Sequence, residues 1–163
     1  MALKPTIFKA QIALADSDRG RFESLSITLA QHPSETLERM LVRLLVYCRN
    51  YDDRLEFTRG LSNPEEPDLW QHNDTGEILH WIEVGQPEPG RLRKACPRAK
   101  HTSVYAFGSA ANTWWSINGD DIRALNSLEV WLFDWHEIEN LTQAVRKKHR
   151  TSDNQEIHLH FDH

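Results

Sequence analysis

The chain has 163 residues, of which 39% are hydrophobic and 26% are charged, with a formal net charge of −5 at pH 7. This length and composition predict one soluble globular domain over residues 1–163, and they exclude a disordered chain. No apolar run approaches the roughly 20 residues needed to span a bilayer. The negative charge argues against indiscriminate coating of nucleic acid, although a local basic face can still bind it.

Two segments near the N-terminus alternate between apolar and polar residues. Residues 6–15 and 21–30 have this pattern, and the sequence DSDRG between them is typical of a turn, so we expect a β-hairpin. Lys9 and Gln11 interrupt the apolar residues where a signal peptide would have an uninterrupted core. We therefore expect a cytoplasmic protein.

The spacing of apolar residues becomes helical within residues 32–51. Ser34 is a suitable N-cap, and Glu35 in the first turn suits the positive end of the helix dipole. One face of this helix carries the apolar residues Leu37, Met40, Leu41, Leu44, Leu45 and Cys48.

The rest of the chain alternates between predicted strands and helices. We expect a short strand at 54–60, a hairpin over 67–85, a helix at 90–100 that Pro97 bends or shortens, and a strand at 102–108. A helix at 109–118, a strand at 127–133, a helix at 136–149 and a strand at 155–162 follow. This order predicts an α/β protein in which a mixed β-sheet has helices packed on its faces.

The hairpin over 67–85 carries two acids, Asp68 and Glu83, near its open end. If Asn73 lies opposite Gly76 in the turn, Asp68 is diagonal to Glu83 on one face, about 7 Å away at Cα. A register shifted by one residue would place them on opposite faces. On one face they suit a shared Mg²⁺; the alternative is two ordinary acids at strand ends.

The same segment resembles a known nuclease signature. Pro67-Asp68, fourteen residues and then Glu83-Val84-Gly85 are similar to the motif of the PD-(D/E)xK nuclease superfamily. The segments HPSET, ERM, FTRGL, PDLW, WIEVGQP and RKAC resemble the YaeQ family, bacterial proteins with a nuclease-like fold, and this resemblance covers nearly the whole chain. It implies a restriction-endonuclease-like core with an added N-terminal hairpin.

The resemblance also implies roles for individual residues. Asp68 and Glu83 would bind Mg²⁺ or Mn²⁺, and a glutamate of the preceding helix often joins them. Glu35 and Glu38 are the candidates, and we favour Glu38 because the helix dipole alone explains Glu35.

The chain departs from the superfamily at Gly85, which occupies the position of the usual lysine. Gln86 can replace it by hydrogen bonding to the attacking water, or Lys94 can reach back from the following helix; the alternative for each is an ordinary surface residue. The implied catalytic residues are therefore Asp68, Glu83, Gln86 and Lys94.

Residues 90–100 contain five basic residues and no acid. Their one-sided charge suits the binding of nucleic-acid phosphates; the alternative is a solvated helix face. The basic residues are Arg91, Arg93, Lys94, Arg98 and Lys100.

Several other signals are interpreted as structural. His158, His160 and His163 are close enough in sequence to suggest zinc, yet no second cluster supports them. The tryptophans, including Trp114, Trp115 and Trp131, are expected in the core. Cys48 and Cys96 are expected to be reduced packing residues, and Ser34, Ser103 and Cys96 lack the elbow or partnered histidine of a nucleophile.

The sequence thus yields two hypotheses of different classes. The first is a metal-dependent nuclease-like protein that acts on or binds nucleic acid. The second is a non-catalytic interaction or regulatory protein on the same fold, which Gly85 favours.

Overall fold

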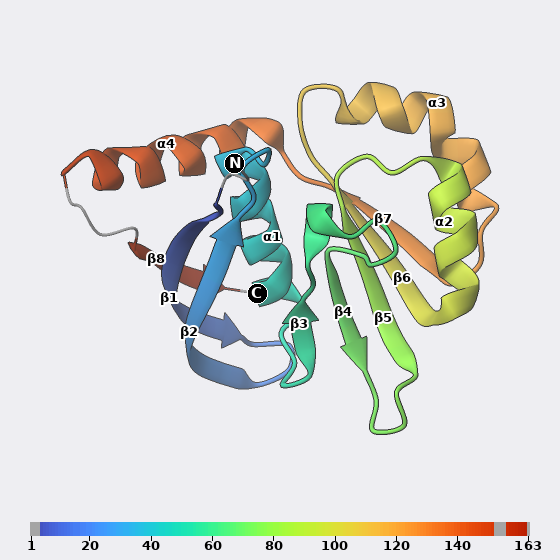
Figure 1. The fold of residues 1–163 in the computed structure, drawn as a ribbon, viewed down its shortest axis with the longest axis horizontal. Helices are drawn as coiled ribbons and strands as arrows, with labels where there is room; N and C mark the ends of the chain where they lie inside the picture. Colours follow the sequence, from blue (N-terminus) through green and yellow to red (C-terminus); the bar gives the residue numbers. More distant parts are fainter. Residues whose placement is uncertain (1–3, 152–155, 163) are drawn as a thin grey trace. The chain divides into compact units, whose positions relative to one another are not determined.

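The computed structural model describes residues 4–151 and 156–162, and the chain divides into two compact units. The first contains Met1–Arg49 and Ile138–His163, and the second contains Asn50–Glu137. Each unit has its own mixed β-sheet (Figure 1). The expected mixed α/β class is confirmed, although the strands form two sheets where one was predicted.

The first unit is built on the predicted N-terminal hairpin. β1 (Thr6–Asp16) pairs antiparallel with β2 (Arg21–Gln31), and β8 (Glu156–Asp162) pairs parallel with β1, which gives the order β2-β1-β8. Along β1 the buried residues Phe8, Ala10, Ile12 and Leu14 alternate with exposed ones. The hairpin is therefore part of a separate three-stranded sheet that the last strand completes.

Helices α1 (Leu37–Arg49) and α4 (Trp135–Thr151) contribute to this unit. Thr36 caps α1, because its Oγ1 accepts the N–H of Arg39 at 3.2 Å. The predicted cap, Ser34, was wrong: it lies farther from the helix, and its Oγ hydrogen bonds to Nδ1 of His32 at 2.7 Å. Within the described part of the chain, no helix is long and apolar enough to cross a membrane.

The second unit contains a five-stranded sheet in the order β3-β4-β5-β6-β7. Its strands are β3 (Leu55–Phe57), β4 (Leu69–His72), β5 (Ile78–Val84), β6 (Ala99–Ala106) and β7 (Leu128–Leu132). β4 pairs antiparallel with β3 and with β5. β6 pairs parallel with β5 and with β7.

Short helical segments connect these strands. A 3₁₀ turn, Gly60–Ser62, follows β3, and α2 (Pro89–Ala95) leads into a second 3₁₀ turn, Cys96–Arg98. The predicted effect of Pro97 is confirmed, because α2 ends just before the residue that lacks an N–H donor. α3 (Ala111–Arg123) joins β6 to β7.

Helices α2 and α3 pack on one face of this sheet. Val104 and Ala106 of β6 share a buried cluster with Leu92 of α2 and with Trp114 and Ile122 of α3. Because side chains alternate along a strand, Ser103 and Tyr105 face the other side. Trp114 is in the core as expected, but the expectation was wrong for Trp131, which is 43% exposed.

The second hairpin forms around the predicted turn, with a different register. The N–H of Gly76 donates to the carbonyl of Asn73 at 3.1 Å. However, Leu69 pairs with Ile82 and Trp70 with Trp81, and the register shifts between Gln71 and His72. The predicted register, in which Asp68 lies opposite Trp81 and diagonal to Glu83, was therefore wrong, because Trp81 pairs with Trp70.

Truncation of Leu41 to Ala tests the helix that supports the first unit. Leu41 is fully buried in α1, so the change should lower the free energy of unfolding by about 2 to 5 kcal/mol. Urea denaturation followed by circular dichroism measures this loss. Truncation of Ile7, which is 46% exposed on β1, is the control and should cost roughly 1 kcal/mol or less. Equal losses in both variants would contradict the burial of Leu41.

Candidate functional site

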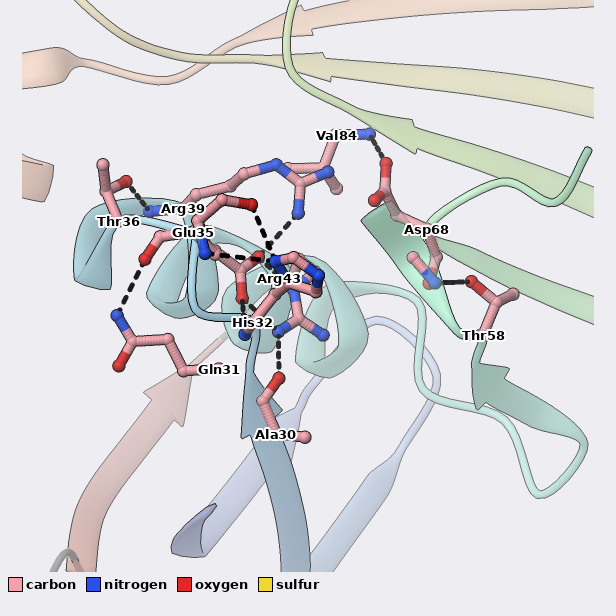
Figure 2. Close-up of polar contacts among 12 residues, drawn as sticks. Ala30, Gln31, His32, Glu35, Thr36, Arg39, Arg43, Thr58, Asp68 and Val84 are labelled. Carbon is pink, nitrogen blue, oxygen red and sulfur yellow. Dashed lines mark hydrogen bonds and ion pairs between the residues drawn. The ribbon is translucent and has the colours of Figure 1, made fainter. Parts of the chain in front are cut away.

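Asp68 is fixed by backbone contacts at the start of the hairpin. It lies one residue before β4 and is 6% exposed. Its Oδ2 accepts the N–H of Val84 at 2.7 Å, and its backbone oxygen accepts the N–H of Thr58 at 3.2 Å (Figure 2). Its own N–H donates to the carbonyl of Ile82 at 3.0 Å. The strands on both sides therefore determine where this carboxylate lies.

Glu83 is the second buried acid, in β5 at 5% exposure. Its Oε1 accepts Nε1–H of Trp81 and Nε–H of Arg91, both at 2.9 Å. Burial raises the pKa of Glu83, and the carboxylate of Asp68 raises it further, whereas Arg91 and Trp81 oppose the rise. The two acids are thus close enough to interact, and this arrangement favours an added proton or a cation.

Arg91 connects α2 to this acid and to the segment before β4. Besides Glu83, its guanidinium donates to the carbonyl of Pro64 at 2.7 Å and to that of Glu66 at 2.9 Å. A phosphate contact by Arg91, as predicted, would compete with these bonds. The observed contacts make Arg91 the residue that positions Glu83.

A pocket of about 290 Å³ lies beside these residues. The guanidinium of Arg98 stacks 4.8 Å from the ring centroid of Trp81, and Lys94 is exposed at the pocket wall. The lining residues are Pro64, Glu65, Trp81, Arg91, Lys94, Ala95 and Arg98. The pocket therefore brings together three of the five predicted basic residues.

The other two basic residues are not lining residues of this pocket. Arg93 is exposed on α2, and Lys100 is exposed on β6. Nζ of Lys100 lies 3.6 Å from Oε2 of Glu77, the residue directly before β5. Their predicted part in nucleic-acid binding stays a prediction.

The backbone at Gly85 favours glycine over lysine. Its φ is 125°, a conformation that other residues adopt at a cost, and its N–H donates to the carbonyl of Tyr105 at 2.9 Å. The neighbouring Gln86 donates Nε2–H to the carbonyl of Phe107 at 2.7 Å. The amide of Gln86 is therefore held in place, and the positive charge of the site comes from α2.

The two glutamates considered as a third metal ligand both belong to the first unit. Glu35 is buried before α1, where Arg43 binds it at both oxygens, at 2.7 and 2.8 Å, and Arg39 binds it at 2.6 Å (Figure 2). The prediction that Glu35 lies in the first helical turn was wrong. Glu38 is in α1 and pairs with Arg146 of α4 at 3.3 Å. Its role as a ligand stays a prediction.

A histidine and glutamate cluster occupies the opposite face of the five-stranded sheet. His80 of β5 pairs with His101 of β6, and Glu129 of β7 pairs with Ser103. One ligand atom from each of His80, His101 and Glu129 lies within 4.8 Å of the others. Sequence reasoning missed this cluster, because its members are far apart in the chain and only parallel pairing brings them together.

Ser103 is the centre of the hydrogen bonds in this cluster. Its Oγ is 2.7 Å from Nε2 of His80 and donates to Oε1 of Glu129 at 2.9 Å. The prediction that Ser103 lacks a histidine partner was therefore wrong. A catalytic triad is still not formed, because the serine lies between the histidine and the acid.

The remaining sequence signals have ordinary contacts. His158 and His160 lie 3.7 Å and 3.0 Å from acids of their own strand, Glu156 and Asp162. His163 lies outside the described residues. Both cysteines are free thiols, and burial raises the pKa of Cys48 to about 12, which suits a packing residue.

Comparisons with known proteins point to one family. A family model described as YaeQ protein matches residues 1–157. The chain is 44% identical over 144 residues to the uncharacterized protein YaeQ of Salmonella typhi, covering 88% of this chain and 80% of that relative. It is 43% identical over 143 residues to the uncharacterized protein YaeQ of Escherichia coli K12, covering 87% and 79% of the two chains.

Solved structures agree with the sequence relatives. The crystal structure of YaeQ protein from Xanthomonas axonopodis pv. citri has a TM-score of 0.83 and 40% identity, covering 97% of this chain and 84% of the other. The YaeQ protein from Pseudomonas syringae has a TM-score of 0.84 and 36% identity, covering 97% and 83%.

Replacement of Arg91 by Met tests the contact that opposes the raised pKa of Glu83. Without the guanidinium, Glu83 faces Asp68 with less compensation, so the pKa of Glu83 should rise further. A pH titration of the side-chain carboxyl carbon by NMR measures it. The matched change in exposed Arg93 of the same helix should leave the pKa unchanged. A lower pKa of Glu83 in the Arg91→Met variant would contradict the role of Arg91 in opposing the rise.

Acid should destabilise the protein through His80. Burial, and then the charge of His101, lower the pKa of His80 to about 4 from an ordinary value near 6.5. The unfolded chain therefore binds the proton first, and stability is lost as the pH falls from about 6.5 to 4, by up to about 3 kcal/mol.

Urea denaturation in chelator-containing buffer at a series of pH values measures this loss. The free energy of unfolding of wild type minus that of His80→Gln should fall by that amount toward pH 4. The matched change in His136, which is exposed on α4, is the control. If this difference in the free energy of unfolding did not change with pH, the imidazole of His80 would not be buried in the wild type.

Proposed function

The chain belongs to the YaeQ family, and we propose that Asp68 and Glu83 bind Mg²⁺ or Mn²⁺ in a site that hydrolyses phosphodiester bonds of nucleic acid. The observation that carries this proposal is the proximity of two buried carboxylates, through which Asp68 raises the pKa of Glu83. Burying two acids together is unfavourable unless a proton or a cation compensates their charge.

The proposal includes a finer fold assignment. The chain has a helix (α1), a β-hairpin with one acid at its start and one in its second strand (β4–β5), a second helix (α2) and a parallel strand (β6) in this order, with β3 and a 3₁₀ turn between α1 and β4. This order is the one expected for the restriction-endonuclease-like core of the PD-(D/E)xK superfamily. A cytoplasmic location, where nucleic acid is accessible, belongs to the same proposal.

The donor atoms fit a hard divalent cation. Mg²⁺ is usually bound by one or two carboxylates and retains several waters. The two hydrogen bonds given above for Glu83 both use Oε1, so Oε2 is available as a ligand. Bound there, the cation would lower the pKa of a water molecule and neutralise negative charge on the phosphate.

The chain's own residues position the site and supply charge. The N–H of Val84 orients Asp68, and Arg91 with Trp81 orients Glu83. Lys94 lines the same pocket as Trp81 and Arg91, which supports its assignment as the replacement for the lysine absent at Gly85. Arg98, stacked on Trp81 in this pocket, is placed to contact a backbone phosphate.

One observation favours the second hypothesis. Arg91 already compensates part of the charge of Glu83, which reduces the need for a metal ion. A non-catalytic interaction protein would keep this ion pair and the basic pocket without needing Lys94. The two functions therefore differ in what they require of Asp68 and Lys94.

Metal-dependent cleavage of mixed single- and double-stranded DNA and RNA distinguishes the two functions. Wild type should cleave at least one substrate with Mg²⁺ or Mn²⁺, and Asp68→Asn should abolish both cleavage and calorimetric Mn²⁺ binding. Lys94→Met should bind Mn²⁺ but cleave roughly 10²- to 10³-fold more slowly. Lys147→Met, at an exposed site on α4, is the matched control.

The outcomes that contradict the nuclease proposal are specific. Wild type that cleaves no substrate with either cation would leave the interaction protein as the function. Cleavage that persists in Asp68→Asn would assign the activity to a contaminant or to another site.

A further inference from the structure

We propose that His80, His101 and Glu129 form a zinc-binding site that joins three neighbouring strands of the five-stranded sheet. The three residues come from β5, β6 and β7 and share one face of the sheet, opposite to the face that α2 and α3 cover. The inference does not depend on the proposed nuclease function, because Glu83 belongs to the other face.

The side chains already converge without a metal ion. The ring centroids of His80 and His101 are 5.0 Å apart, and Nε2 of His101 is 3.3 Å from Oε1 of Glu129. All three candidate ligand atoms lie within 4.8 Å of one another. Ligand atoms of a tetrahedral zinc ion are separated by about 3.3 to 3.5 Å, from bond lengths of about 2.0 to 2.2 Å. Small side-chain rotations therefore complete the geometry.

The donor set selects zinc over the cations considered for Asp68 and Glu83. Two imidazoles and one carboxylate are ligands typical of Zn²⁺, whereas Mg²⁺ prefers oxygen ligands and water. Three protein ligands leave a fourth position for water or for Oγ of Ser103. The fully buried Ser103 holds His80 and Glu129 close together before the ion binds.

The exposure of the ligands suits metal entry. The side chains of His101 and Glu129 are 43% and 40% exposed, so the ion can reach them from solvent. His80 would then bind the ion from the sheet side, and His101 and Glu129 would bind it from the solvent side.

Titration of chelator-treated and desalted protein with Zn²⁺ by calorimetry tests the site. We expect one equivalent per chain, and Co²⁺ in its place should give the strong visible absorption of a tetrahedral complex. His101→Gln and Glu129→Gln, both at partly exposed positions, should each weaken Zn²⁺ binding by tenfold or more. Circular dichroism should show that both variants are folded.

Three further measurements separate this site from the other candidate metal ligands of the chain. The double variant His158→Gln/His160→Gln, which removes two exposed histidines of β8, should bind Zn²⁺ as wild type does. Asp68→Asn should also bind it unchanged, which distinguishes the zinc site from the proposed nuclease centre. A millimolar excess of Mg²⁺ should not displace the zinc.

The proposal is overturned by any of three results. These are the absence of stoichiometric Zn²⁺ binding, equal affinity in His101→Gln, Glu129→Gln and wild type, and loss of binding in the β8 double variant. The last result would assign the ion to surface histidines.

Discussion

Both sites depend on the alternation of side chains along β5. His80, Trp81, Ile82 and Glu83 are consecutive, so successive side chains point to opposite faces of the sheet. His80 thereby meets His101 and Ser103 on one face, and Glu83 meets Arg91 of α2 on the other. A shift of β5 by one residue relative to β6 would reverse every side chain and disrupt both arrangements together. The register of this one strand is therefore the constraint on which the chemistry of the unit depends.

Stability alone does not account for the polar residues that β5 carries. A partly buried ion pair such as Glu83 with Arg91 gains little over well-packed apolar residues, because removing charge from water offsets the attraction. The strand is central in its sheet, where near-continuous apolar residues are typical. Val104 and Ala106 of the neighbouring strand β6 follow that rule. The proposed binding roles would give the polar residues of β5 a function that packing alone does not.

The sequence predicted local structure well and long-range pairing poorly. Apolar spacing located the helices and strands. α2 ends before Pro97, and the chain turns at Asn73–Gly76, as the chemistry of these residues predicts. The hairpin register differed by two residues. His72 already pairs with Ile78, one residue beyond the predicted partner, and the irregularity between Gln71 and His72 adds a second residue. Asp68 and Glu83 were identified through family resemblance, whereas the cluster at His80 requires the order of three parallel strands, which sequence spacing does not contain. Thr36 displaced Ser34 as the cap because the helix starts two residues later than the pattern suggested.

Gly85 stands where the superfamily has a lysine. The contacts of Arg91 decide how much of the role of that lysine is left for Lys94 in the proposed nuclease. In the proposed nuclease site, Glu83 can contact Arg91 through Oε1 and a cation through Oε2, so one carboxylate serves both. The carbonyls of Pro64 and Glu66 hold the guanidinium without neutralising its charge, because they are uncharged. Arg91 therefore contributes a fixed positive charge near the two acids, but hydrogen bonds from all three of its nitrogens hold the guanidinium in place, so it cannot follow a phosphate as its charge develops. A flexible ammonium at the pocket wall can do so. In the proposed nuclease, Arg91 would therefore limit the rise in the pKa of Glu83, and Lys94 would stabilise the transition state.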